Sequence, residues 1–280
     1  MQISSKRPKV SVIMAVFNEE DCIKGTIESV INQTFGNFEF IIINDASTDK
    51  TQEILEDYAQ KDKRIKIFVN EKNIGPIKST NRGIRCSKGE LIARMDAGDI
   101  CQLGRFEKQV KFLDKNKNVY IVGSYHYWID KEGRIIGAYR FPVTPEQTKK
   151  NLFRFSSIAA QPAVMIRKEL FEKTGPYTTL YQTSEEYELY ARTIKNGRGI
   201  ANIPEFLISI IRRRKGISEK KTRAIFVNQA RIKAVYLPHI FNFRNFIYTV
   251  GSLFFVLLPA DLLRKAVRIS IKHQKIREIF

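Results

Sequence analysis

Carboxylate side chains stand at separate points of the chain, in settings where they could act on one substrate. Asp45 follows the apolar run 40–43, and Asp96 and Asp99 follow the apolar run 91–95. Both runs are typical of buried strands, and an open α/β sheet places its binding crevice at the carboxyl ends of its strands. A pair of carboxylates at such a crevice can hold a divalent cation and, through it, a diphosphate.

A further acidic cluster lies far downstream, where Glu185, Glu186 and Glu188 follow one another closely. A separate carboxylate of this kind could accept the proton of an attacking hydroxyl. A cation, a diphosphate and a base are the groups needed to transfer a group from a nucleotide to a hydroxyl. Oxygen ligands suit Mg²⁺ or Mn²⁺, and the sequence offers no cluster of thiolates or histidines in their place.

Each acidic cluster also has a purely structural interpretation. Asp45 and Asp49 could cap a helix, and Asp99 could cap the helix that follows it. The three glutamates could form the solvated face of a helix. The choice between these interpretations depends on the elements that position the clusters.

The elements of the first half alternate. Apolar runs predict strands at 9–16, 38–43, 65–69, 91–95 and 119–123, and helical spacing predicts helices at 20–32, 54–58, 76–84 and 105–115. This alternation favours an α/β fold, with a mostly parallel sheet and helices on both faces. It breaks near Tyr125, where 128–130 and 134–136 flank a three-residue turn and predict a hairpin. Beyond it, helices are expected at 145–153 and 185–194, and extended segments at 163–166 and 207–211.

Length and composition are those of a globular protein with one large domain and an appendage, at 280 residues and 43% hydrophobic. Cys22, Cys86 and Cys101 lack paired metal-type spacing and are expected to be reduced thiols. The polar start at 1–9 runs directly into a strand, so we expect no secretory signal.

Basic charge is concentrated in the C-terminal quarter. Residues 206–280 hold 16 Lys and Arg against 3 Asp and Glu, whereas residues 1–205 hold 32 against 26. Such a surface suits either nucleic acid or an anionic membrane. Because few aromatic residues are interleaved with these charges, we do not expect nucleic acid as the partner.

Within this quarter an apolar segment lies beside a basic one. Residues 245–260 carry no charge but fall short of the roughly 20 apolar residues that span a bilayer as a helix. Residues 262–275 combine an apolar stripe with Arg and Lys, which is typical of a helix in a membrane interface. We expect a catalytic domain at 1–215 and a helical extension at 216–280, with 245–280 against an anionic membrane. An ordinary packed helix pair is the alternative.

Several stretches resemble the family 2 inverting glycosyltransferases, which have the GT-A fold and use nucleotide-sugar donors. Residues 10–20 are similar to the family's opening strand, and 29–35 to its first helix and turn. Residues 38–49 resemble the strand that ends in two aspartates and a Ser-Thr-Asp turn, and 185–188 the segment with the catalytic base. The resemblance covers residues 10–218 and rests on the order and spacing of these motifs.

The resemblance implies a role for each candidate residue. Glu186 would be the catalytic base, and Asp96 and Asp99 would hold the metal and the diphosphate. Phe17 would border the nucleotide base, and Asp45 would contact its edge. The residues implied for the nucleotide sugar are Ala15, Phe17, Glu19, Asp45, Lys78, Asp96 and Arg212.

Three positions depart from the family pattern. Asn44 replaces the first aspartate of the pair, and Glu186 stands where aspartate is usual. Gly98 occupies the third position of the Asp-x-Asp motif, which usually ligates the metal. Asp99, one residue later, is the expected substitute.

The expected activity is metal-assisted transfer of a sugar, with inversion, from a nucleotide-diphosphate sugar to a hydroxyl of a glycan. The acceptor is expected to be lipid-linked or a polysaccharide, and the enzyme to be cytoplasmic and peripheral on the inner face of the membrane. The alternatives are a nucleotide-sugar-binding or scaffold protein without catalysis, and a nucleotidyltransferase. The loop 17–20 is acidic, which argues against the last, because that reaction needs a basic, glycine-rich loop there.

Overall fold

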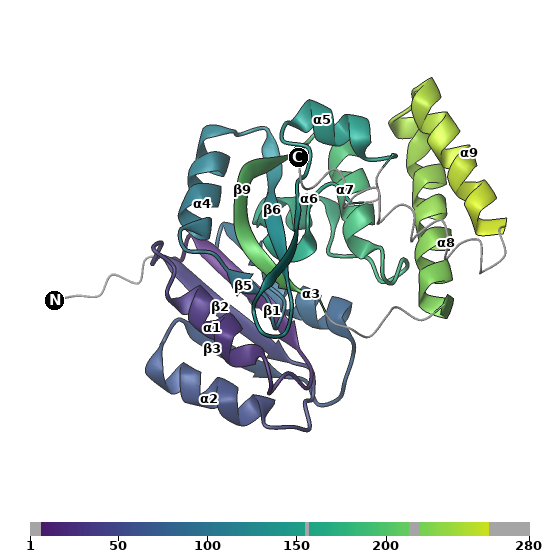
Figure 1. Cartoon of the computed structure of the whole chain (residues 1–280). Coiled ribbons are helices and arrows are strands. Elements are labelled where there is room, and N and C mark those ends of the chain that lie inside the picture. The colour runs from purple at the N-terminus through teal and green to yellow at the C-terminus, as the bar shows by residue number, and fades with distance from the viewer. Residues whose placement is uncertain (1–6, 155–156, 213–218, 258–280) are drawn as a thin grey trace.

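One sheet with helices on both faces makes up most of the computed structural model, which describes residues 7–154, 157–212 and 219–257 (Figure 1). Within these residues the strand order is β3-β2-β1-β4-β8-β6-β9-β5, with β7 paired to β6. The strands are β1 (Val10–Val16), β2 (Phe38–Asn44), β3 (Ile65–Val69), β4 (Leu91–Arg94), β5 (Ile100–Cys101), β6 (Val119–Ile129), β7 (Ile135–Tyr139), β8 (Met165–Arg167) and β9 (Gly199–Ile211). The helices are α1 (Ile23–Ile31), α2 (Thr51–Lys61), α3 (Pro76–Cys86), α4 (Arg105–Lys115), α5 (Pro145–Asn151), α6 (Lys168–Thr174), α7 (Glu185–Lys195), α8 (Glu219–Tyr236) and α9 (Phe243–Leu257).

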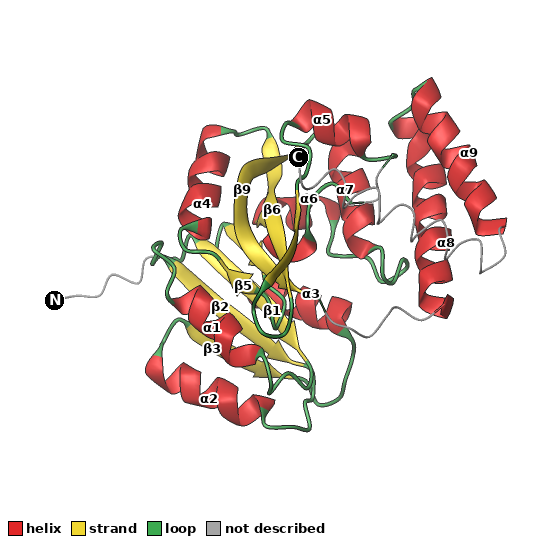
Figure 2. Ribbon diagram, in the orientation of Figure 1, coloured by secondary structure: helices red, strands yellow, loops and turns green. Residues whose placement is uncertain are grey.

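The strands β1 to β4 run parallel, and their side chains alternate between two cores. Val12 and Met14 point into the core that α1, α2 and α4 cover, whereas Ile13 points into the core that α3, α6 and α7 cover. Figure 2 shows the yellow strands between these red helices. Antiparallel pairs all involve β5, β7 or β8. The expected α/β fold, with a mostly parallel sheet and flanking helices, is confirmed.

The second half of the sheet has longer strands than the apolar runs indicated. β6 continues to Ile129 instead of ending at 123, and β9 begins at Gly199 instead of 207. The two pair in parallel, and their register shifts between Ser124 and Tyr125, opposite Pro204. Because proline has no amide hydrogen to donate, Pro204 argues against a strand in the sequence. The register shift leaves Pro204 unpaired and lets β9 continue in the sheet on either side of it.

The helices α8 and α9 stand at the edge of the molecule, with α8 against α7 (Figure 1). Ile232 and Tyr236 belong to the same core as Tyr187 of α7, and Tyr236 Oη donates to Glu188 Oε1 at 2.6 Å. The division of the chain after residue 215 stays a prediction. Among the described helices, none has the length and apolar character to cross a membrane. The helix expected at 262–275 lies outside the described residues.

Candidate active site

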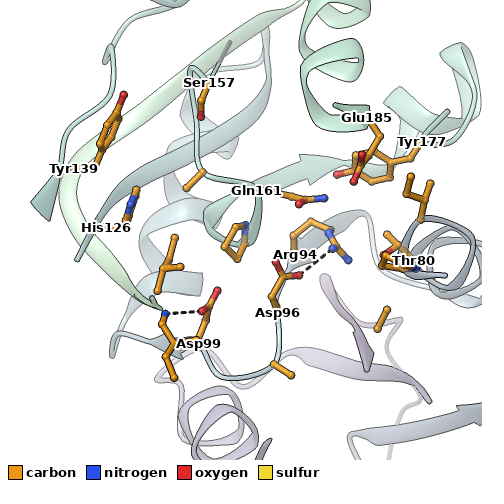
Figure 3. Close-up of a pocket in the computed structure, with 18 of the residues that line it drawn as sticks. Thr80, Arg94, Asp96, Asp99, His126, Tyr139, Ser157, Gln161, Tyr177 and Glu185 are labelled. Carbon is orange, nitrogen blue, oxygen red and sulfur yellow. Dashed lines mark hydrogen bonds and ion pairs between the residues drawn. The ribbon is translucent and has the colours of Figure 1, made fainter. Parts of the chain in front are cut away.

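A cleft of about 810 Å³ opens at the carboxyl ends of β1 and β4. Arg94, Asp96 and Gln161 lie near its middle in Figure 3, with Glu185 toward one end and His126 toward the other. It is the crevice that an open α/β sheet is expected to place at its strand ends. Its volume suits a ligand of the size of a nucleotide sugar.

The loops that follow β1 and β2 are bonded to each other at one side of the cleft. Asn18 has a positive φ of 55° and accepts the amide of Thr48 at 2.8 Å through its side-chain oxygen. The amide of Glu19 donates to Thr51 Oγ1 at 2.9 Å, which fixes the start of α1 against the start of α2. Ala15, near the end of β1, and Glu19, in the loop after it, line the cleft. The segment 47–49 therefore holds a neighbouring loop in place.

Asp45 is buried at the end of β2 and fastens the loop before α3. Its Oδ1 accepts the amide of Ile74 at 2.9 Å and the side-chain amide of Asn70 at 2.6 Å. Its Oδ2 accepts the amide of Gly75, also at 2.9 Å. Gly75 has a φ of 88°, a conformation that favours glycine, and α3 begins at the next residue. Through these bonds Asp45 places the start of α3, from which Pro76, Ile77 and Thr80 line the cleft.

A buried arginine stands beside the carboxylate that follows β4. Arg94 is only 3% exposed, and its Nη2 contacts Asp96 Oδ1 at 3.2 Å (Figure 3). Asp99 lies deeper than Asp96, and its Oδ1 accepts the amide of Ile211 at 3.0 Å at the end of β9. The turn between the two carboxylates passes through Gly98 with a φ of 93°. Opposite charges thus meet at the middle of the cleft.

The start of α7 brings two glutamates towards Arg94 and Asp96. Burial raises the pKa of Glu185, which lines the cleft, while the charge of Arg94 opposes the rise. Burial and the charge of Glu185 raise the pKa of Glu186 above the usual range of a glutamate. A carboxylate with a raised pKa is suited to taking a proton near neutral pH.

Strain and unpaired groups also gather at the start of α7. Thr183 has a φ of 72°, an unfavourable conformation for a β-branched residue. The hydroxyls of Thr183 and Ser184 and one oxygen of Glu185 are buried without a hydrogen-bond partner in the described structure. Such features persist at functional sites, where a ligand supplies what the chain does not.

The structure places the residues expected from the sequence in two groups. Ala15, Glu19, Asp96 and Asp99 line the cleft. Five others are not among its lining residues: Phe17, Lys78 and Arg212, which are exposed, Asp45, which is buried, and Glu186, which is partly buried. Glu185 lines the cleft next to Glu186 in the chain.

Sequence reasoning missed several lining residues. Arg94 is at the end of an apolar strand, where nothing distinguishes it from a surface charge. Tyr177 follows α6, and His126 had no assigned role. Residues 125–128 are four aromatic residues in a row, and the two-residue period of a strand could have shown that 126 and 128 share a face.

The charged groups of the cleft fit a small divalent cation that shares its ligands with a diphosphate. Asp96 and Asp99 supply carboxylate oxygens, the ligand type that Mg²⁺ and Mn²⁺ prefer. The described residues contain no group of three or more acidic, histidine or cysteine side chains arranged around a metal position. A cation here would therefore take its remaining ligands from substrate phosphates and water.

Comparison with known proteins identifies the family. Residues 11–175 match the model for glycosyl transferase family 2. The chain belongs to this family. An uncharacterized glycosyltransferase of Methanocaldococcus jannaschii is 32% identical over 283 residues, which cover 96% of this chain and 95% of the relative. The Escherichia coli UDP-Glc:alpha-D-GlcNAc-diphosphoundecaprenol beta-1,3-glucosyltransferase WfaP is 30% identical over 67% of this chain and 71% of its own length.

Solved structures show that this family 2 enzyme has the GT-A fold. Residues 1–349 of Staphylococcus aureus TarS, in complex with UDP-GlcNAc, superpose with a TM-score of 0.65 at 20% identity, covering 91% of this chain and 83% of that fragment. The Pyrobaculum calidifontis mannosyltransferase PcManGT, in complex with GDP-Man and Mn²⁺, gives a TM-score of 0.64 at 16% identity, covering 95% and 81%. The expectation from sequence that the chain is a glycosyltransferase of family 2 is confirmed.

Proposed function

We propose that this glycosyltransferase moves a sugar from a nucleotide-diphosphate donor to a hydroxyl of a lipid-linked or polysaccharide glycan, with inversion. The observation that carries the proposal is the single cleft that holds Arg94, Asp96 and Asp99 and receives the glutamates at the start of α7. One group of charges suits the leaving diphosphate, and the glutamates suit the attacking hydroxyl. A single displacement with a base opposite the leaving group inverts the anomeric carbon.

The leaving group gains negative charge as the glycosidic bond breaks. Arg94, buried and 3.2 Å from Asp96, holds a positive charge at the middle of the cleft without needing to move. Asp96 and Asp99 would hold Mg²⁺ or Mn²⁺, and PcManGT was crystallised with Mn²⁺. Such a cation, when bound, neutralises part of the diphosphate charge.

The attacking hydroxyl must lose its proton as the new bond forms. We assign this proton to Glu186, whose raised pKa makes it a stronger base than an exposed glutamate. Glu185 is the alternative, because its side chain lines the cleft and it adjoins Glu186. The base and the leaving-group charges would then act on opposite sides of the transferred sugar.

The nucleotide is proposed to lie along the loops after β1 to β3. Ala15 and Glu19 line this part of the cleft, and Phe17 beside them is 44% exposed, so its ring is available to a base. Asp45 would contact the edge of the base, and it would also shape the nucleotide site by holding the loop before α3. Lys78 and Arg212 would reach the phosphates from the cleft's rim.

A donor screen tests the proposal. UDP-Glc, UDP-GlcNAc and GDP-Man are incubated with the full chain, and release of UDP or GDP is measured with Mn²⁺, with Mg²⁺ and after EDTA. We expect slow hydrolysis of one donor, lost in EDTA and restored by either metal. A parallel incubation supplies UTP or GTP with a sugar 1-phosphate, and release of pyrophosphate there would instead indicate a nucleotidyltransferase. Donor binding without turnover, even with acceptors, would indicate a binding or scaffold protein.

The proposed membrane partner is supported by α9, whose apolar and polar faces are reversed relative to a water-soluble helix. Asn245 and Thr249 are buried, and Ser252 Oγ accepts from Lys233 Nζ of α8 at 2.6 Å. A surface helix in water buries its apolar stripe instead. The exposed apolar residues of α9 are Phe243, Phe246, Ile247, Val250, Leu253 and Phe254.

Charge around this stripe indicates an anionic bilayer as its partner. Residues 220–260 contain no Asp or Glu. Arg244 is exposed and donates to the backbone of Lys150, and Lys149 and Lys150 of α5 are exposed beside it. Apolar side chains flanked by basic ones are typical of a helix in a membrane interface. The enzyme is proposed to sit peripherally on the inner face of the membrane through 245–280, where a lipid-linked acceptor would be presented; the acceptor named for WfaP is a diphosphoundecaprenol.

Vesicle sedimentation tests the membrane partner. The full chain should sediment with phosphatidylcholine vesicles that contain phosphatidylglycerol, less so at high salt, and not with phosphatidylcholine alone. Replacing Phe246 and Val250 together by serine should abolish sedimentation. The matched control replaces Ile135 and Ile136, an exposed apolar pair on β7, and should leave it unchanged. Equal vesicle binding by both double variants would contradict the proposal. So would a dimer of this chain that forms without vesicles and that the Phe246/Val250 variant fails to form, because α9 would then bind a second copy instead of a bilayer.

A further inference from the structure

One end of the cleft is an aromatic wall, defined by His126, Trp128, Tyr139 and Phe141. It arises from the alternation of β6. Tyr125 and Tyr127 pack against Phe206, with ring centroids 5.5 and 4.2 Å away, so the intervening His126 and the following Trp128 face the opposite side of the sheet. Tyr139, at the end of β7, and Phe141, just after it, come to the same side.

The rings of the wall are in mutual contact. The His126 ring stacks on Tyr139 at 5.5 Å and meets Trp128 edge-on at 4.9 Å. Tyr139 and Phe141 are 4.6 Å apart. Trp128 and Tyr139 are half-buried, so part of each ring surface is open to the cleft. The wall is therefore a continuous apolar surface inside a charged cleft.

A polar group within this wall is left without a partner. His126 is 3% exposed, and in the described structure neither of its ring nitrogens makes a hydrogen bond. Burial lowers its pKa to about 4, so the ring is neutral at physiological pH, with one nitrogen a donor and the other an acceptor. A buried polar group without a partner is costly, and where it persists it indicates a partner that the chain does not supply.

Polar side chains lie between this end and the middle of the cleft. Ser157 and Asp99 are nearer the wall, and Gln161 lies toward the middle (Figure 3). A pyranose ring has the matching chemistry, with apolar C–H faces that pack on aromatic rings and hydroxyls around its edge. A nucleobase also stacks on aromatic rings, but Ala15, Pro76 and Ile77 line the cleft beside the loops assigned to the nucleotide.

We propose that the aromatic wall is a subsite for a pyranose ring, which packs against Trp128 and Tyr139 and directs one hydroxyl to His126. This inference rests on the proposed sugar transfer and adds where a sugar is held. The ring belongs either to the donor's transferred sugar or to the acceptor glycan. Because both nitrogens of His126 are buried, a hydroxyl reaches them only when the ring of Trp128 or Tyr139 turns, so binding alters the surroundings of Trp128.

The chain reports on this site directly, because Trp128 is its only tryptophan. Its fluorescence is followed while the protein is titrated with methyl glycosides of glucose, N-acetylglucosamine and mannose, with and without UDP or GDP. UDP-Glc, UDP-GlcNAc, GDP-Man and the free nucleotides are titrated separately. We expect a saturable change with a sugar-bearing ligand. A change with a nucleotide sugar but no glycoside assigns the ring to the donor, and a change with a glycoside assigns it to the acceptor.

Two variants test whether the wall makes the contact. His126→Phe keeps the aromatic packing and removes both nitrogens, and Tyr139→Ala removes one ring; each should weaken the sugar response about tenfold. Tyr127→Phe, on the other face of β6, is the matched control and should leave it unchanged. No saturable response to any sugar, or a full response to UDP or GDP alone, overturns the subsite. Donor hydrolysis without such a response overturns the subsite alone, whereas a response without turnover of any donor overturns the proposed function alone.

Discussion

Two sides of the cleft differ in how their polar groups are paired. On the proposed nucleotide side, formed by the loops after β1 to β3, Asn18 is bonded to the loop after β2, and Asp45 to the loop before α3. Among the described residues 7–93, every fully buried side-chain nitrogen or oxygen has a hydrogen-bond partner. The second side is formed by the β6–β7 hairpin, with His126, and by the start of α7, with Thr183 and Ser184; these three residues have buried polar atoms without a partner in the described structure.

This difference indicates which parts of the site are complete before substrates bind. The loops of the proposed nucleotide side hold each other, so their shape does not depend on a ligand. The second side keeps groups that lower stability by about 1–3 kcal/mol each until a partner arrives. A protein retains such groups where they bind or react, which is consistent with the base proposed near one end of this side and the sugar subsite proposed near the other.

The largest effect should come from the start of α7. Glu186→Gln keeps the shape of the side chain and removes its ability to take a proton, so turnover should fall roughly 10²-fold or more while donor binding persists. Because burial penalises the charged carboxylate, the variant should be at least as stable as the parent at neutral pH. Steady-state rates and donor titration measure the two parts. If Glu185→Gln loses turnover and Glu186→Gln retains it, the base is Glu185.

Two alanine substitutions should differ in their effect on the free energy of unfolding, one on each side of the cleft. Asp45→Ala leaves the amides of Ile74 and Gly75 without their carboxylate, so urea unfolding should show a loss of about 2–4 kcal/mol, with weaker nucleotide binding. Ser184→Ala removes a buried hydroxyl that has no partner in the described structure and should raise the unfolding free energy by about 1 kcal/mol or more. Equal losses in the two variants would remove the distinction between the two sides.

The difference between the two sides of the cleft also appears in how well the sequence predicted the strands beneath them. Strands β1 to β4 were predicted to within a residue or two, because β1, β2 and β4 are largely apolar runs buried on both faces and the edge strand β3 is a short apolar run. The long strand β9 resembles a loop in sequence, because it contains Asn202, Pro204 and Glu205. Its pairing with β6 depends on a register shift that only the folded sheet supplies.

The site follows the same division. Asp96 and Asp99 could be found because they come soon after a strand in a regular sheet, whereas Ala15 and Glu19 were expected from the family resemblance. The aromatic wall depends on which face of β6 meets the cleft, and that follows from the hairpin's place in the sheet rather than from local sequence. The position of Glu185 relative to Glu186 depends on the conformation of Thr183, which no propensity predicts.

Replacement of a positive-φ residue by glycine should have opposite effects on the two sides of the cleft. Thr183→Gly relieves the cost of a positive φ in a β-branched residue and should raise the unfolding free energy by about 1 kcal/mol. Asn18→Gly also replaces a residue with a positive φ, but it removes the side chain that accepts the amide of Thr48 and should lower stability by a similar amount. Thermal unfolding of both variants gives the signs. Two changes in the same direction would contradict the assignment of strain to Thr183 alone.

The smallest expected effect is on pH dependence. The raised pKa of Glu186 means that this carboxylate is still partly protonated at pH values where an ordinary glutamate is ionised, so kcat/KM should rise with pH through that higher pKa. The charge of Glu185 contributes to the rise in the pKa, and Glu185→Gln should therefore move the acidic limb of the profile to lower pH. Glu205→Gln, an exposed carboxylate paired with Lys108 away from the cleft, should leave the limb in place. If the acidic limb of Glu185→Gln stays at the same pH or moves to higher pH, the two glutamates do not interact in the working enzyme, and burial alone raises the pKa of Glu186.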